Sequence, residues 1–179
     1  MAQWIALLRG INVGGHGRLP MKSLAQTLEG IGASDVQTYI QSGNVVFESA
    51  ARSAAKLAAE INAAIEAEHG FAPAVLALRP KDLAGAIAAN PFAEKAHESD
   101  GKALHLLTLA AAPKSPDLGA LEQATHATES WKIIGRFMYL YAPNGLHKSK
   151  VAAKAERAVG VTVTARNWRT VSKIAGMCR

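Results

Sequence analysis

The order of strands and helices in the first 79 residues is the feature that most constrains this fold. Short apolar or β-branched runs bounded by turn residues have the length of strands. Two longer stretches repeat apolar residues every three or four positions, which is typical of amphipathic helices. Strands are predicted at residues 3–8, 36–40, 45–48 and 73–78, and helices at 20–30 and 53–68. This order, βαββαβ, is that of a ferredoxin-like domain.

The second half of the chain repeats this order with little residue identity. Strands are predicted at residues 102–109, 129–134, 137–142 and 161–166, and helices at 117–124, 149–159 and 170–177. Between the halves, Arg79-Pro80 begins a connecting helix, and the charged segment 93–102 predicts an exposed linker. We therefore expect an α+β protein of two ferredoxin-like (βαββαβ) subdomains related by duplication. Their predicted bounds are 1–79 and 102–179, with a connecting helix and linker at 80–101.

The composition indicates a globular protein. Of the 179 residues, 49% are hydrophobic and 19% are charged, so a core can be buried. No apolar run has the length of a membrane span, and the N-terminal residues do not resemble a signal peptide. A single cysteine, Cys178, excludes an internal disulfide and suits a reducing compartment. These features predict a cytoplasmic protein with no membrane partner.

The net charge of +6 favours anionic partners, although a role in solubility alone explains it equally well. The glycine-rich stretch from Arg9 to Gly17 suggests where an anion could bind. It joins the first strand to a helix that begins near Pro20, so its backbone N–H groups would lie near the positive end of that helix. The same glycines are also what a long turn requires.

Strand directions in a βαββαβ unit place further polar residues at the edges of the two sheets. The end of the first strand should lie beside the turn at 41–44, and residues 144–150 should lie beside 164–169. We expect the two edges to face one another across a cleft between the subdomains. The predicted ligand-binding residues are Arg9, Asn12, Gly14, Gly15, Gln41, Ser42, Asn44, Lys148, Ser149, Arg166 and Asn167.

Structural roles remain open for several of these residues. Ser42 and Asn44 are typical of a hairpin turn, and for Asn12 and Asn167 a role as cap or turn residues explains them as well as ligand binding does. Ser149 is a good N-cap for the helix at 149–159.

Motifs for specific chemistry are missing. The glycine loop matches neither the dinucleotide-binding fingerprint nor the P-loop. The six histidines and the lone cysteine show no metal-ligand spacing, and no nucleophile or acid–base pair stands out. The sequence therefore predicts no metal site and identifies neither a catalytic residue nor a cofactor. An RNA-binding sheet would use Trp4 and Phe47, but the basic and aromatic pattern of an RNP1 motif is missing.

Three blocks of sequence resemble a family of uncharacterised bacterial proteins, domain of unknown function 1697. They are residues 7–15, 38–47 and 164–171, and residues 147–150 are similar to the Ser-Lys helix start of that family. The resemblance extends from the first strand to the last helix. It implies an α+β fold of two related subdomains and supplies no established activity.

The sequence thus favours a protein that binds an anionic small molecule, phosphorylated or nucleotide-like, in a cleft between two subdomains. Arg9, Lys148 and Arg166 would supply the positive charge. Whether it is an enzyme stays open. The alternatives are a basic nucleic-acid-binding module and a protein-interaction module without a ligand.

Overall fold

The structure, a computed structural model, describes residues 1–179, and the chain divides into two compact units. Unit 1 comprises residues 1–84 and 174–179, and unit 2 comprises residues 85–173. Each unit is described on its own below. No helix combines the length and the apolar character that crossing a membrane requires.

Unit 1 is built on a four-stranded antiparallel sheet with the strand order β2-β3-β1-β4. Its elements, in chain order, are β1 (Ala2–Arg9), α1 (Met21–Gly30), β2 (Ser34–Tyr39), β3 (Asn44–Ser49), α2 (Ala54–His69) and β4 (Ala74–Leu78). Each predicted element of this half is present, with ends shifted by one or two residues. Pro20, expected as the first helical residue, instead occupies the N-cap position of α1.

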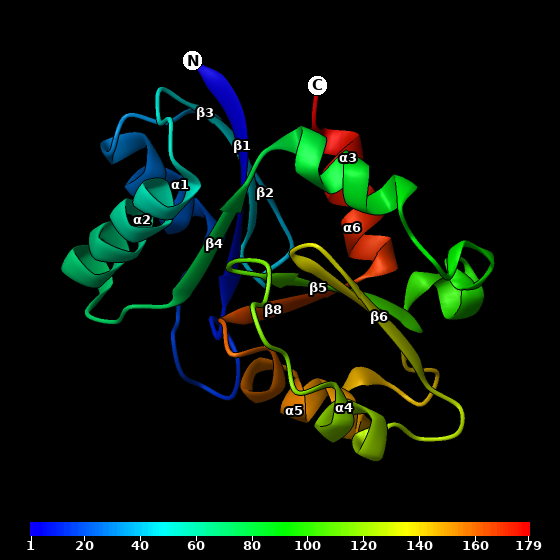
Figure 1. Ribbon diagram of the computed structural model, residues 1–179. Helices are drawn as coiled ribbons and strands as arrows, with labels where there is room; N and C mark the ends of the chain where they lie inside the picture. Colours follow the sequence, from blue (N-terminus) through cyan, green and yellow to red (C-terminus); the bar gives the residue numbers. More distant parts are fainter. The chain divides into compact units, whose positions relative to one another are not determined.

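The core of unit 1 lies between the sheet and its two helices. Alternate residues of β1, Trp4, Ala6 and Leu8, face α1 and α2 and are almost fully buried. Helix α2 contributes Leu57 and Ile61, which lie one turn apart on its buried face. Both helices lie together on one side of this sheet (Figure 1).

Unit 2 repeats this arrangement, with the strand order β6-β7-β5-β8, again antiparallel throughout. Its sheet and the helices against it are β5 (Leu104–Leu109), α4 (Leu118–Ala124), β6 (Ser130–Ile134), β7 (Phe137–Tyr141), α5 (Lys150–Val159) and β8 (Val163–Asn167). The short 3-10 helix η3 (Leu146–Lys148) precedes α5, while α3 (Pro80–Ala88) and α6 (Trp168–Met177) each span a division between the units. The chain is thus an α+β protein with two four-stranded antiparallel sheets, as predicted.

The core of unit 2 forms in the same way as that of unit 1. Leu107 and Leu109 of β5 face Leu121 of α4 and Val151 of α5. Helices α4 and α5 lie side by side on this face of the sheet (Figure 1).

The segment at 93–101 has most of its residues exposed but is not irregular. It forms two short 3-10 helices, η1 (Ala93–Lys95) and η2 (Glu98–Gly101), with Ala96 and Gly101 buried. The Tyr141 hydroxyl donates a hydrogen bond to Glu98, and Asp100 forms an ion pair of 2.7 Å with Arg169. Its charged residues thus bind side chains of unit 2, which the sequence pattern alone did not reveal.

Candidate functional site

In unit 1, the end of β1 lies beside the turn between β2 and β3, as the strand directions predict. Leu7 pairs with Asn44, and the Leu8 N–H donates to the Gly43 carbonyl at 2.8 Å. Gly43 packs so closely here that an added Cβ would come within 2.7 Å of side-chain atoms of Leu8 and Ile11. The close approach requires glycine at this position.

The glycine-rich loop forms a small hairpin of its own. The His16 N–H donates to the Val13 carbonyl at 3.1 Å, and the Asn12 N–H donates to the Gly17 carbonyl at 3.0 Å. Gly14 and Gly15, both at positive φ, form the two-residue turn at the exposed tip. The glycines therefore have a defined structural role, and their anion-binding role stays a prediction from the sequence.

The carboxamide of Asn12 holds this hairpin against the rest of the unit. Its Nδ2 donates to the carbonyls of Leu19 and Gln41, each at 2.8 Å, and its Oδ1 accepts from the Leu19 N–H at 2.8 Å. Both amide hydrogens are thus engaged in joining the two ends of the loop to the β2–β3 turn. Asn12 adopts a positive φ of 54°, which asparagine tolerates better than most residues.

Asn44 is fully buried, and its carboxamide also serves the backbone. Its Nδ2 donates to the Tyr39 carbonyl at 2.9 Å and to the Ser42 hydroxyl at 3.0 Å. Gln41, in contrast, is exposed, and it is its backbone carbonyl that binds Asn12. Arg9 is exposed at the end of β1. The predicted residues of this half are therefore brought together, and the two asparagines hold the loops in place.

In unit 2, the ends of β7 and β8 lie on either side of β5. Leu104 pairs with Tyr141, and His105 pairs with Asn167. Asn167 caps α6 by accepting a hydrogen bond from the Thr170 N–H at 2.9 Å. Ser149 caps α5 by accepting from the Ala152 N–H at 3.1 Å, so its predicted N-cap role is confirmed.

Arg166 lies on β8 and is largely removed from solvent. Its Nη1 donates to the Thr164 hydroxyl at 2.9 Å and to the Ala165 carbonyl at 2.8 Å. Burial lowers the pKa of the guanidinium to about 10, because the charged form loses hydration. The group still carries its charge at neutral pH.

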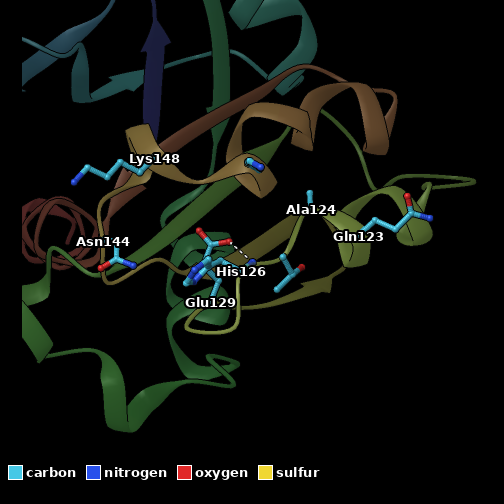
Figure 2. Close-up of a pocket in the computed structure, with 8 residues that line it drawn as sticks. Gln123, Ala124, His126, Glu129, Asn144 and Lys148 are labelled. Atoms are coloured by element: carbon cyan, nitrogen blue, oxygen red, sulfur yellow. Dashed lines mark hydrogen bonds between the residues drawn. The ribbon is translucent and has the colours of Figure 1, made fainter.

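A cavity of about 470 Å³ opens beside the first turn of α5 (Figure 2). One wall comes from the end of α4 and the loop before β6, with Gln123, Ala124, Thr125, His126 and Glu129. The other wall comes from the segment after β7, with Asn144, Lys148 and Lys150. Of the predicted ligand-binding residues, only Lys148 lines this cavity.

Hydrogen bonds fix the loop that carries His126. The Thr128 N–H donates to Nδ1 of His126 at 3.3 Å, and the Thr128 hydroxyl lies 2.9 Å from the same nitrogen. Asn144 donates to that hydroxyl at 3.3 Å, which links the two walls. The His126 N–H donates to the Glu129 carboxylate at 3.1 Å (Figure 2). Because Nδ1 accepts from a backbone N–H, the neutral imidazole carries its hydrogen on Nε2.

Positive charge gathers on the second wall of the cavity. Neither the Lys148 nor the Lys150 ammonium group makes a hydrogen bond or an ion pair, and both side chains are exposed. The N-terminus of α5, with its positive dipole end, lies between them. In Figure 2 the Lys148 side chain extends away from His126, and its four-carbon stem lets the charge move by rotation.

The remaining acidic, cysteine and histidine side chains do not assemble a metal centre. No group of three or more His, Cys, Asp or Glu residues lies close enough together to hold a metal ion. The cavity contains one carboxylate, Glu129, and one imidazole, His126. The chemistry that this set of groups supports is the binding of an anion and of polar hydrogen-bonding groups.

The fold of this chain is shared with a bacterial protein of solved structure. The structure is similar to that of the conserved bacterial protein SP0830 from Streptococcus pneumoniae, with a TM-score of 0.71 and 23% sequence identity over 99% of this chain and 98% of that one. This likeness shows a shared α+β fold of the same extent.

The family follows from the sequence. The chain belongs to the family described as protein of unknown function DUF1697, whose model matches residues 1–139. The first two sequence blocks fall inside this match, while residues 147–150 and 164–171 lie beyond it. A comparison with curated proteins finds no match.

Proposed function

We propose that this protein binds an anionic small molecule, phosphorylated or nucleotide-like, in the cavity of unit 2. The observation that carries this proposal is the pair of lysines, Lys148 and Lys150, which line a cavity of about 470 Å³ and whose ammonium groups have no partner in the protein. This volume falls in the range of known small-molecule pockets.

The surroundings of the two lysines support an anion rather than a neutral ligand. Two positive charges at the start of a helix oppose the dipole of that helix, and a bound anion offsets this repulsion. The N-cap residue Ser149 already satisfies one backbone N–H of α5, so the lysines are the main contribution to anion binding. Asn144 and His126 add further hydrogen-bonding groups to the same cavity.

A thermal-shift screen at fixed ionic strength tests the proposal. It covers nucleotides, sugar phosphates, inorganic anions and short oligonucleotides. A ligand at 100 times its dissociation constant stabilises the fold by about 2.7 kcal/mol, which gives a visible shift. We expect one phosphorylated small molecule to stand out, and the double variant Lys148→Ala/Lys150→Ala to lose that shift.

The control variant is Lys154→Ala. Lys154 is an exposed lysine of the same helix, and it lines a different hollow, together with Asp117 and Arg157. Replacing it should leave the shift unchanged. Stabilisation by oligonucleotides alone, falling steeply with salt, would support a nucleic-acid-binding module instead. If no compound in the screen raises the melting temperature, the proposal is contradicted.

We also propose that each half is a ferredoxin-like subdomain and that the two halves arose by duplication. The same element order, the same strand order and the same helix-covered face in each sheet support it. The ligand-binding roles of Arg9, Gln41 and Arg166, and a cleft shared by both halves, stay predictions from the sequence.

A further inference from the structure

The turn that follows β7 carries the pair Asn144-Gly145, the one Asn-Gly sequence in the chain. We propose that Asn144 is a site of spontaneous deamidation, and that its conversion to aspartate or isoaspartate adds a negative charge to the cavity of unit 2. Asn144 lines that cavity together with Lys148 and Lys150 (Figure 2). The modification itself needs no ligand, while its consequence for anion binding rests on the proposed function above.

The reaction is an attack of a backbone nitrogen on the side-chain amide before it. The deprotonated nitrogen of Gly145 forms a bond to Cγ of Asn144, the C–N bond of the carboxamide breaks, and ammonia leaves with the proton that the glycine nitrogen has lost. Water then opens the resulting five-membered succinimide at one of its two carbonyl groups. One opening gives aspartate, and the other gives isoaspartate, in which the main chain runs through Cβ and Cγ. One water is consumed and one ammonia is released, with no oxidation or reduction.

Gly145 supplies an accessible nucleophile. Glycine has no Cβ that would crowd the attack of its nitrogen. The Gly145 N–H donates to the Ala142 carbonyl at 3.0 Å, which closes the turn at residues 142–145. This hydrogen bond must open before the nitrogen can react. Because the turn lies outside every helix and strand, such local opening costs far less free energy than unfolding of the sheet.

Asn144 is the least restrained of the asparagines in this chain. It is the only one that is exposed, and its carboxamide makes a single hydrogen bond, of 3.3 Å, to the Thr128 hydroxyl. Asn12, the other asparagine with a comparable loop position, has both amide hydrogens engaged. It also precedes Val13, whose β-branched side chain hinders attack by its own nitrogen.

The remaining asparagines are hindered in other ways. Asn62 lies within α2 and Asn44 begins β3, and the hydrogen-bonded backbone of a helix or a strand opposes closure of the succinimide ring. Asn90 precedes Pro91, whose nitrogen has no hydrogen to lose. Asn167 caps α6 through its side-chain oxygen. Asn144 is therefore the position at which both the sequence and the structure favour the reaction.

Deamidation changes the charge at the cavity by one unit. A carboxylate at position 144 repels an anion and attracts the ammonium groups of Lys148 and Lys150, which would otherwise bind that anion. A carboxylate also cannot donate to the Thr128 hydroxyl, as the carboxamide does. Isoaspartate in addition lengthens the main chain just ahead of η3, which carries Lys148. The modification therefore weakens anion binding.

Timed incubation of the full chain at mildly alkaline pH, followed by proteolysis and mass spectrometry, tests the site. We expect Asn144 to deamidate at least about tenfold faster than Asn12, because only the Asn144 turn opens easily. The same measurement in guanidinium chloride separates the fold from the sequence. Unfolding should accelerate the reaction of Asn12, which loses three hydrogen bonds, far more than that of Asn144. Asn144→Gln should stop the reaction at this position, since glutamine would have to close a six-membered ring.

Asn144→Asp reproduces the charge of one product and tests the effect on the cavity. Titration with inorganic phosphate at fixed ionic strength should show binding about tenfold weaker in this variant than in the wild type. The matched control is Gln26→Glu, which adds the same charge at an exposed position of α1 in unit 1. It should leave phosphate binding unchanged.

The outcomes separate this inference from the proposed function. Deamidation of Asn144 no faster than that of Asn12, or equal acceleration of the two by unfolding, would overturn the modification site. Phosphate binding that is the same in Asn144→Asp and in the wild type would overturn the effect of the new charge. If the wild type binds neither phosphate nor any compound of the thermal-shift screen, the proposed function is wrong and the effect on binding falls with it. The modification site is decided by mass spectrometry alone in that case.

Discussion

The sheet edges of the two units use their polar side chains in opposite ways. In unit 1, the carboxamides of Asn12 and Asn44 bind backbone carbonyls and hold loops together. In unit 2, Ser149 and Asn167 cap helices, while Lys148 and Lys150 beside them keep unpaired charges at a cavity. We take the difference to mean that a polar residue at a sheet edge is a candidate for ligand binding only when its polar group has no partner in the protein.

The largest effect on stability is expected from Gly43→Ala, which tests how closely the loops of unit 1 pack. A Cβ at Gly43 would lie 2.7 Å from Leu8 and Ile11 atoms, and the residue has a φ of 75°. Overpacking and backbone strain together should lower the free energy of unfolding by about 3 kcal/mol. Urea denaturation measures this decrease in the free energy of unfolding. Gly15→Ala is the control, because φ is 79° there but nothing lies within 4 Å, so only about 1 kcal/mol should be lost.

The second prediction concerns Asn12→Ala. The substitution removes three hydrogen bonds and leaves groups of Leu19 and Gln41 without their partner. We expect a loss of about 2 kcal/mol in the free energy of unfolding and no change in the anion binding that we propose for unit 2. Gln41→Ala keeps the carbonyl that Asn12 binds and should change stability by less than about 0.5 kcal/mol. Equal losses of stability in the two variants would show that the Asn12 carboxamide does not hold the loop to the β2–β3 turn.

The smallest effect is a pH dependence due to His105 in β5. His105 is only 7% exposed, its Nδ1 has no hydrogen-bond partner, and desolvation by burial lowers the pKa of its imidazole below 6.5. As the pH falls below 6.5, the unfolded chain takes up a proton that the folded chain does not, so stability should decrease. Denaturation between pH 7.5 and pH 5 should show this decrease, and His105→Leu should reduce it.

The exposed His16 supplies the control for that experiment. His16→Ala removes an imidazole from the exposed surface of the glycine-rich loop, and its profile is measured in parallel. A profile that is the same in wild type and in His105→Leu would show that the buried imidazole does not couple folding to protonation.

The sequence predicted the order of elements because strand and helix periodicities are local. It also predicted the αL glycine in the β2–β3 turn and the cap at Ser149, which depend on a few neighbouring residues. The hydrogen bonds of the Asn12 carboxamide could not be predicted from neighbouring residues, since one of its partners, Gln41, lies 29 residues away. A strained feature was missed as well: Ile40 in the same turn adopts a φ of 50°, which its β-branched side chain disfavours.

The candidate site was predicted only in part, for a similar reason. Lys148 was identified from its position before a helix, but Gln123 lies at the end of α4 and His126 and Glu129 lie in the loop after it, and no recognisable motif marks them. The spacing of His126 and Glu129, three residues apart before a strand, was the one local signal of a tight turn. It became meaningful only once the fold placed Lys148 across the cavity from it.

The last residues of the chain have a consequence for how the protein can be engineered. Residues 174–179 belong to unit 1, where the Arg179 N–H donates to Gln3 at 2.9 Å and its guanidinium binds Asp35 at 2.6 Å. Residues 1 and 179 therefore lie near one another, as circular permutation requires. A short linker between them, with new ends opened in the exposed residues 110–112, should give a permuted chain that folds.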